Sequence, residues 1–306
     1  KKGQDSIGVA RQYCGTAGKV DNCQVGVFAA YVSEQGYALV DKRLFIPKKW
    51  FTDAYFERRE KCKLPAETVF RTKPQLAVEM LGDILKQETL PFKYVLADSL
   101  YGVSPEFIEA VEALPDKTYF VQVPKDTLCW LKRPMAITKQ YLWGGKTRTK
   151  TVLVDPDSKP ISVDKLAENI NDYFWYRRKV SEGTKGPIVY EYTRRQIILS
   201  AAGLPQKTVC LLIRRTLDDE PQYSFFISNA STSTRLKMLV WLSGLRWAIE
   251  QCFEETKSEL GMDHYEVRKF TGWHHHMLTC MLAHFFLWHM KIKLGKKSTV
   301  YYAIAA

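Results

Sequence analysis

The chain has 306 residues and carries 45 Lys and Arg against 33 Asp and Glu, a formal net charge of +12. A surplus of this size favours a polyanionic partner, with nucleic acid ahead of an anionic membrane surface. Hydrophobic residues make up 46% of the chain, which argues against disorder, and no apolar run is long enough to span a bilayer. We therefore expect one large domain or two ordinary ones, with no membrane partner.

Cysteine usage and the opening residues indicate the compartment. The seven Cys are scattered, odd in number and never spaced as Cys-x2-Cys, which favours reduced thiols in a cytoplasm over disulfides or a zinc knuckle. The charged opening residues lead into no apolar core, so no signal peptide is expected. The chain does not begin with Met, and we expect it to be a fragment.

Strand patterns open the chain. Aromatic and β-branched runs at residues 6–13, 23–32 and 37–46 are separated by Gly-containing turns, a pattern typical of consecutive antiparallel strands. Asp21 is interpreted as a turn residue between the first two runs. Residues 47–65 are polar and predict an irregular connection.

Helical and buried-strand patterns alternate from residue 73 to residue 123. Apolar residues at helical spacing predict helices at 73–87 and 105–114, and short apolar runs predict buried strands at 94–98, ending on a carboxylate, and at 119–123. Three antiparallel strands followed by helix, strand, helix and strand is the order of a ribonuclease H-like fold. In that order Asp98 falls at the end of the fourth strand.

The next hundred residues have a different texture. Strand-like runs separated by polar turns predict a β-rich insertion rather than the closing helix of the fold; the runs are 149–154, 173–180, 188–193, 196–201 and 209–215. We therefore predict an α/β chain with a ribonuclease H-like catalytic core and a β-rich insertion before the last catalytic helix. Its parts are residues 1–123, the first part of the core; 124–222, the insertion; and 223–306, the completion of the core.

The last part predicts one strand and three helices. The strand is 223–228, and the Ser and Thr residues at 231–234 offer helix caps. Helices follow at 236–242 and 245–260, interrupted at Gly244 and closed by Gly261. A final apolar helix covers 275–294, after a basic, His-rich segment.

The helix at 245–260 carries the first chemical signal. Arg246, Glu250 and Lys257 are spaced by four and seven, so they project along one helical face beside an apolar stripe. An ordinary ion pair on a solvated helix is the alternative. Asp98 shifts the balance, because burying a lone carboxylate at a strand end without a partner or a metal is expensive.

Topology connects the two carboxylates. In a ribonuclease H-like fold the final helix packs against the fourth strand, so Asp98 and Glu250 could share divalent metal. Mg²⁺ prefers carboxylate and water oxygens, and a pair of such ions can activate a nucleophile and stabilise a leaving oxygen in phosphoryl transfer on DNA. We expect Mg²⁺, with Mn²⁺ as a substitute, held by Asp98 and Glu250.

The spacing Arg246, three residues, Glu250, six residues, Lys257 resembles the Tyr-x2-Arg-x3-Glu-x6-Lys signature of insertion-sequence DDE transposases, with Ser243 where the signature has Tyr. Other stretches resemble a DDE-superfamily endonuclease family of this kind: Gly8-Val-Ala-Arg-Gln-Tyr-Cys-Gly15, Asp21-Asn-Cys-Gln-Val-Gly-Val27, Ala97-Asp-Ser-Leu-Tyr-Gly102, Glu259-Leu-Gly-Met-Asp-His-Tyr-Glu-Val-Arg268 and Gly272-Trp273.

The resemblance implies a bacterial transposase of the cytoplasm and nucleoid, which cleaves and transfers DNA strands. It makes Asp98 the second acid and Glu250 the third, with a β-rich insertion between them. The first acid would lie upstream of Lys1, in a segment whose tail is Lys1-Lys2-Gly3, and Asp5 would be a weak substitute at a strand edge. Transposon ends and target DNA, bound by a homodimer, are the implied partners.

Several other residues have two interpretations. Glu254 and Glu255 compete with Glu250, or belong to a solvated helix surface. Three adjacent residues, His274–His276, do not face one ligand point, so DNA or surface contact is favoured over metal. The remaining candidates for DNA contact are His264, Arg268, Trp175, Arg177 and Arg178, with Tyr173, Tyr176 and Lys179 beside the last three. Their alternatives are a turn fixed by Asp263 and Arg268, and an ordinary two-sided strand; in the DNA-binding interpretation the aromatic rings stack on an unpaired base.

Two other functions stay open. One is a truncated or domesticated transposase that binds DNA without catalysis, which an absent first acid favours. The other is a metal-dependent nuclease or resolvase that cleaves DNA without joining it.

Overall fold

The computed structural model describes residues 3, 5–33, 35–183 and 186–294. Lys1 and Lys2 of the expected Lys-Lys-Gly tail therefore lie outside the described residues, as does the end of the segment predicted at 223–306. The chain divides into two compact units, Lys1–Pro91 with Trp247–Ala306 and Phe92–Arg246. The predicted boundaries at 123 and 222 remain predictions.

Two antiparallel ribbons form the sheet structure of the first unit. Strand β1 (Ala10–Cys14) pairs with β2 (Lys19–Cys23), and β3 (Val25–Ser33) pairs with β4 (Gly36–Phe45). A 3₁₀ turn (Gly15–Ala17) and Gly18 in the left-handed region (φ 62°) reverse the chain between β1 and β2. The prediction of three consecutive strands was therefore wrong at its start, and Asp21 lies in a strand opposite Gln12 rather than in a turn.

The connection predicted as irregular is helical. It holds two 3₁₀ helices, η2 (Lys48–Phe51) and η3 (Asp53–Tyr55), and helix α1 (Phe56–Cys62). Trp50 explains the difference, because its ring is fully buried and its indole nitrogen donates a hydrogen bond to the carbonyl of Val9 at 3.0 Å. Trp50 anchors the segment to the core, and Phe51, Tyr55 and Leu64 pack against the same core.

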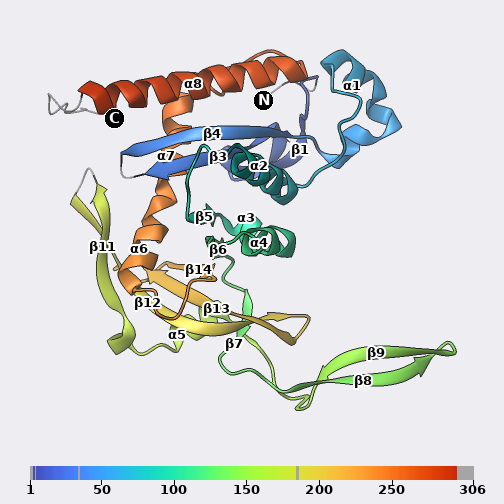
Figure 1. The fold of residues 1–306 in the computed structure, drawn as a ribbon, viewed down its shortest axis with the longest axis vertical. Helices are drawn as coiled ribbons and strands as arrows, with labels where there is room; N and C mark the ends of the chain where they lie inside the picture. The colour runs from blue at the N-terminus through green and yellow to red at the C-terminus, as the bar shows by residue number, and fades with distance from the viewer. Residues whose placement is uncertain (1–2, 4, 34, 184–185, 295–306) are drawn as a thin grey trace. The chain divides into compact units, whose positions relative to one another are not determined.

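Three helices pack on the β3–β4 ribbon. Helix α2 (Lys73–Gln87) has the predicted bounds and begins with a capping box between Thr72 and Gln75. Helices α7 (Trp247–Ser258) and α8 (Phe270–Leu294) return to the same ribbon from the end of the chain. Figure 1 shows α8 and α2 on opposite sides of β3 and β4. The buried core of this unit includes Leu39, Trp50, Cys252 and Trp273.

The second unit is built on an eight-stranded mixed sheet with the order β10-β7-β12-β13-β14-β6-β5 and with β11 paired to β12. Strands β5 (Tyr94–Ala97) and β6 (Thr118–Val123) are parallel, and the other pairs are antiparallel. Helices α3 (Ser99–Gly102) and α4 (Pro105–Glu112) connect β5 to β6. The mixed α/β class is confirmed, and the ribonuclease H-like order remains a prediction, since β3–β4 and β5–β6 lie in different sheets and different units.

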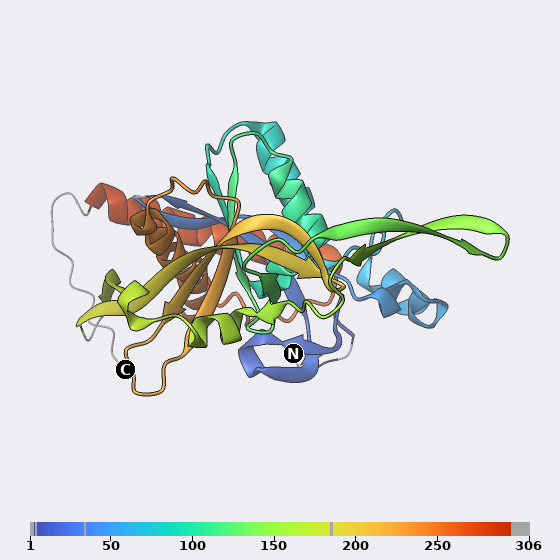
Figure 2. The ribbon, with the colours of Figure 1, turned by 90° about the horizontal axis from the view of Figure 1, so that it is seen from below.

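The region predicted as a β-rich insertion contains most strands of this sheet. They are β7 (Leu128–Trp130), β10 (Ile161–Ser162), β11 (Tyr176–Gly183), β12 (Gly186–Ala201) and β13 (Leu204–Arg215), with helices α5 (Val163–Glu168) and η4 (Asp172–Phe174); β14 (Tyr223–Ser228) follows directly after this region. The runs at 188–193 and 196–201 are one strand, since Arg194 and Arg195 continue the ladder to β13. Strands β8 (Ala136–Trp143) and β9 (Lys146–Leu153) form a separate two-stranded ribbon, visible in Figure 2.

Helix α6 (Leu236–Leu245) starts at the predicted residue, but its cap and its end differ from the prediction. Its first cap is Arg235, which makes no side-chain capping bond, while Ser231 accepts from the Ser233 amide in a turn before the helix. The helix runs through Gly244, where a Cβ atom would meet Val180 at 2.5 Å, so only glycine fits. The break falls at Arg246, and Gly261 (φ 62°) follows α7 as predicted. No described helix combines the length and the apolar character needed to cross a membrane.

Candidate active site

Asp98 lies directly after β5 and caps helix α3. One carboxylate oxygen, Oδ1, accepts a hydrogen bond from the amide of Leu100 at 2.9 Å. The side chain is exposed, so the argument that a metal must compensate its burial was wrong. An aspartate is favoured at this position by capping alone. Its charge is still felt nearby: burial first, and the Asp98 carboxylate second, raise the pKa of Tyr101.

The motif around Asp98 has a packing explanation at Gly102. A Cβ atom there would lie 2.0 Å from the carbonyl oxygen of Gln122, in β6. Glycine therefore permits the close approach of α3 to the strand beside β5, and this approach fixes the turn that presents Asp98. The second carboxylate oxygen, Oδ2, forms no hydrogen bond with any described residue, which leaves a hard donor facing solvent.

Glu250 stands in the first turn of α7 and is exposed. The opposite side of the helix is buried through Ala248, Cys252 and Thr256. Lys257 follows seven residues later on the same face as Glu250, with its ammonium group 5.6 Å from the centre of the Phe253 ring. Arg246 is the residue between α6 and α7 and belongs to the second unit. A carboxylate in the first helical turn is also favoured by the helix dipole.

Asp98 and Glu250 offer the oxygen donors that Mg²⁺ prefers, and both are accessible. Within the described ranges, no three His, Cys, Asp or Glu side chains come together in a group that could hold a metal ion. Because the two acids belong to different units, their proximity remains a prediction. Asp5, the weak substitute for the first acid, forms an ion pair with Arg268 at 3.5 Å, and both side chains are exposed.

Glu255 is held by three side-chain donors, although it was predicted on a solvated helix surface. Its carboxylate accepts hydrogen bonds from the Tyr37 hydroxyl at 2.8 Å, from His284 Nε2 at 2.7 Å and from the Trp288 indole at 3.3 Å. The His284 nitrogen is assigned as the donor because a carboxylate only accepts. The prediction of a solvated surface for Glu255 was wrong; for Glu254, which is exposed, it was right. A signal was present, since Glu255 lies three and seven residues after two buried positions, Cys252 and Ala248.

These hydrogen bonds set the protonation state of Glu255. Burial alone raises the pKa of its carboxyl group, but the donors from His284, Tyr37 and Trp288 outweigh it, and the net pKa lies below the ordinary value. The pKa of Tyr37 is raised, first by burial and then by its bond to Glu255. The network therefore ties α7 to β4 and α8 through a charged acceptor, both of whose oxygens accept hydrogen bonds.

The three consecutive histidines of α8 do not converge. Burial, with smaller contributions from Lys42 and Arg43, lowers the pKa of His274 to about 4. His275 is exposed, and Nε2 of His276 lies 3.2 Å from the carbonyl of Gly261. His274 and His276 thus have packing roles, and only His275 is fully available for a surface contact.

The remaining candidates for DNA contact fall in two places. His264 is exposed and lies 3.6 Å from Asp263, and Arg268 pairs with Asp5 rather than with Asp263. In the second unit, Arg177 is exposed beside Glu191 at 3.3 Å, and Arg178 is exposed with its guanidinium 5.7 Å from the Tyr176 ring.

Trp175 differs from the expectation of a base-stacking residue. It is 8% exposed, and its ring packs under the guanidinium of Arg215 at 4.2 Å. Arg215 is held in turn by Glu191 and Asp172, each at 2.9 Å. Since no open face of the Trp175 ring remains for a base, we assign it to the core of its unit.

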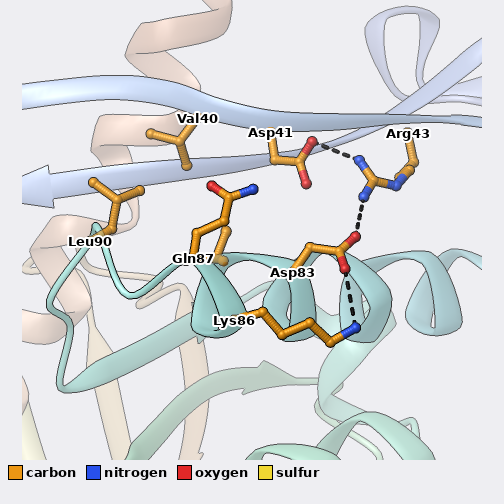
Figure 3. Close-up of a pocket in the computed structure, with 8 residues that line it drawn as sticks. Val40, Asp41, Arg43, Asp83, Lys86, Gln87 and Leu90 are labelled. Atoms are coloured by element: carbon orange, nitrogen blue, oxygen red, sulfur yellow. Dashed lines mark hydrogen bonds and ion pairs between the residues drawn. The ribbon is translucent and has the colours of Figure 1, made fainter.

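Figure 3 shows a hollow of about 340 Å³ between β4 and α2. Arg43 crosses it, with guanidinium nitrogens 2.6 Å from Asp41 and 2.8 Å from Asp83, and Lys86 lies 3.6 Å from Asp83. Both carboxylates are thus engaged by cations. The arrangement holds α2 on the ribbon through ion pairs of Arg43 and Lys86.

The chain has a mixed α/β fold and a surplus of Lys and Arg, which suits it to bind phosphate. Its exposed carboxylates, Asp98 after a strand and Glu250 on a helix, are suited to bind divalent metal. Residues 1–187 match the family model described as DDE superfamily endonuclease. This is more than half of the 306 residues, so the chain belongs to the DDE superfamily endonucleases. Asp98 lies inside the match and Glu250 beyond it.

A curated relative supports the predicted resemblance. The chain is 36% identical over 117 residues to the "Probable transposase for insertion sequence element IS701" of Microchaete diplosiphon. The aligned part is 37% of this chain and 27% of that protein, so the match spans less than a third of the relative. The prediction of an insertion-sequence DDE transposase family is confirmed.

Proposed function

We propose that this chain is the catalytic part of an insertion-sequence transposase that cleaves DNA and transfers its strands with divalent metal. The observation that carries the proposal is the contrast between the acids of α7: Glu250 is exposed in the first turn, whereas Glu255 is taken up by three donors. In a DDE endonuclease, an accessible glutamate on a late helix is the better metal ligand.

In this proposal Asp98 and Glu250 hold the metal, and the site takes Mg²⁺ or, as a substitute, Mn²⁺. When bound, the ions activate the attacking water or 3′-hydroxyl and stabilise the leaving oxygen. Two carboxylates that serve one pair of ions fall within about 4–8 Å of each other. Arg246 and Lys257 hold phosphates without reading sequence, and His264, Arg268, Arg177 and Arg178 extend the contact with DNA.

The finer fold assignment is part of the same proposal. We assign residues 1–123 and 223–306 to a ribonuclease H-like core and 124–222 to a β-rich insertion. The parallel pair β5–β6 with Asp98 at the end of β5 supports the assignment. Strands β3 and β5 each keep one edge without a strand partner in the described part of the chain. The partners are transposon ends and target DNA, bound by a homodimer in the bacterial nucleoid.

The test is cleavage of a duplex that contains the transposon end, by protein expressed from its complete reading frame, with Mg²⁺ or Mn²⁺. Asp98→Asn and Glu250→Gln should each abolish cleavage and leave DNA binding largely intact, because an amide replaces a carboxylate at nearly constant shape. Glu254→Gln is the matched control, since Glu254 is an exposed acid on the same helix.

Three outcomes separate the candidates. Loss of cleavage in Glu254→Gln, with Glu250→Gln active, contradicts the assignment of the third acid. DNA binding with no metal-dependent cleavage by the wild-type protein favours a domesticated DNA-binding protein. Cleavage without strand joining, when target DNA is supplied, favours a nuclease or resolvase.

A further inference from the structure

The β8–β9 ribbon sorts its side chains onto two chemically different faces. Its register pairs Lys139 with Lys150, Tyr141 with Arg148 and Trp143 with Lys146. Side chains that are paired across strands lie on one face, and alternate pairs share it. One face, here termed the cationic–aromatic face, therefore carries Lys139, Tyr141, Trp143, Lys146, Arg148 and Lys150.

The opposite face is uncharged. It carries Thr138, Gln140 and Leu142 from β8 and Thr147, Thr149 and Thr151 from β9. The hydroxyls of Thr138 and Thr151 lie 3.4 Å apart across the strands. Gly144 and Gly145, with φ of 57° and 73°, form the turn at the tip. The segregation extends along the whole ribbon, so it is a property of the element rather than of one residue.

The cationic–aromatic face packs against nothing in the described chain. Every side chain from Ile137 to Trp143 and from Lys146 to Thr151 is exposed. Residues 127–154 contain six Lys and Arg and neither Asp nor Glu. None of the face's four cations forms an ion pair with a described carboxylate. Tyr141, Trp143, Arg148 and Lys150 instead line an open hollow of about 390 Å³.

This arrangement is unfavourable for a ribbon without a partner. Lys139 and Lys150 are directly opposed, and like charges in that position destabilise the pair of strands. An isolated two-stranded ribbon is marginal even without such repulsion. Large exposed rings beside unpaired cations need a ligand that carries negative charge and apolar surface together.

The spacing of the cations fits duplex DNA as the ligand. Lys146, Arg148 and Lys150 recur at every second residue of β9, about 6.8 Å apart in an antiparallel strand. That distance equals two steps along each strand of B-form DNA, and the major groove admits a two-stranded ribbon. A membrane surface presents anionic charge without this repeat.

We propose that the cationic–aromatic face binds duplex DNA, with its cations on phosphates and Tyr141 and Trp143 against the apolar edges of the groove. The choice of DNA as partner rests on the proposed function. The surface is separate from the acids assigned to catalysis, and it extends the DNA contact of a transposase to the arm formed by β8 and β9, seen in Figures 1 and 2.

The first test measures binding of the full chain to a fluorescent duplex in EDTA, over a range of salt concentrations. Arg148→Gln with Lys150→Gln should weaken binding roughly tenfold at low salt and lower the log–log salt slope by about 1.8, or about 0.9 for each phosphate contact. The matched control is Thr147→Ala with Thr149→Ala, which changes the other face of the same strand and should change neither value.

The second test uses the aromatic residue at the tip. Trp143 and Leu142 are adjacent, 67% and 77% exposed, and point to opposite faces. Trp143→Ala should weaken duplex binding several-fold with the salt slope unchanged, whereas Leu142→Ala should leave it near wild type. Thermal unfolding should be the same for all four variants, because the substituted side chains are exposed; a variant that unfolds is replaced by Lys139→Gln, for which a slope reduced by about 0.9 is expected.

Equal effects from the two faces, or none from either, would overturn the proposal. So would a loss of binding to phosphatidylserine vesicles in Arg148→Gln with Lys150→Gln while duplex binding is retained, since the face would then be a membrane contact. Binding in EDTA involves no cleavage, so this test can be interpreted even if the catalytic roles of Asp98 and Glu250 are wrong. Likewise, the cleavage test of Asp98 and Glu250 does not depend on DNA binding by the ribbon.

Discussion

Two of the glutamates of helix α7, five residues apart, lie in different environments. Glu250 is exposed in the first turn, while the Glu255 side chain is 31% exposed and accepts three hydrogen bonds from β4 and α8. Burial and a shifted pKa usually make a carboxylate the stronger candidate for chemistry. On α7 they mark a structural tie instead, because both oxygens of Glu255 already accept hydrogen bonds from protein groups.

The comparison predicts that substituting Glu255 destabilises the fold much more than substituting Glu250. Glu255→Gln should lower the free energy of unfolding by about 2–4 kcal/mol, since it replaces a charged acceptor bonded to Tyr37, His284 and Trp288. Glu250→Gln should change it by less than about 1 kcal/mol, as is usual for an exposed acid. Urea denaturation of the two variants measures both values. A larger loss in Glu250→Gln would reverse the roles assigned to the two acids.

The same comparison can be sharpened with pH. The folded-state pKa of Glu255 lies below the ordinary value of 4.5 for a glutamate, so ionised Glu255 contributes stability that is fully present above the unfolded pKa. That contribution is lost as the pH falls through the folded pKa. The difference in thermal midpoint between wild type and Glu255→Gln should therefore be constant near pH 7 and shrink below about pH 4.5. A difference that is flat down to pH 3 would show that Glu255 does not act through its charge.

Local patterns predicted much of the fold. Helix α2 has the predicted bounds, and β5, β6, β14, α7 and α8 lie within a few residues of them. In each of these elements, the positions of the apolar residues indicate which side chains of that helix or strand are buried. The wrong predictions fall where contacts between different segments decide the structure. The segment around Trp50 is helical because Trp50 packs in the core and bonds to Val9. Strand β12 continues through Arg194 and Arg195 because it pairs with β13 there.

The candidate site shows the same limit. The spacing of Arg246, Glu250 and Lys257 could be found in one predicted helix, although Arg246 lies just before α7, and the exposure of Glu250 agrees with the prediction. The environment of Glu255 could not, because its partners Tyr37 and His284 come from 218 residues before it and 29 after it. Likewise, the two faces of the β8–β9 ribbon depend on the register between its strands, and β8 was not predicted.

The smallest expected effect concerns the cation that shares the Glu250 face. If that face meets DNA, Lys257 contacts a phosphate, and Lys257→Ala should lower the log–log salt slope for transposon-end DNA by about 0.9 with only a modest loss of affinity at low salt. Arg246→Ala should lower it by a similar amount. Salt-dependent anisotropy with an end-containing duplex gives the slopes.

Two further variants separate charge from packing in this prediction. Lys257 also lies over the Phe253 ring, so alanine removes packing as well as charge, whereas Lys257→Gln keeps much of the stem. Lys61→Ala is a control for net charge, since Lys61 is a highly exposed lysine of α1 paired with Glu57 at 3.8 Å.

If the slope falls in Lys257→Ala and Lys257→Gln but not in Lys61→Ala, the charge of Lys257 contacts DNA, and the exposed face of α7 is its binding face. An equal fall in all three would mean that the slope follows net charge alone, and an unchanged slope in all three would make Lys257 an ordinary helix charge. Either result would contradict the prediction that the face of α7 with Glu250 contacts DNA, whereas the structural role of Glu255 would be unaffected.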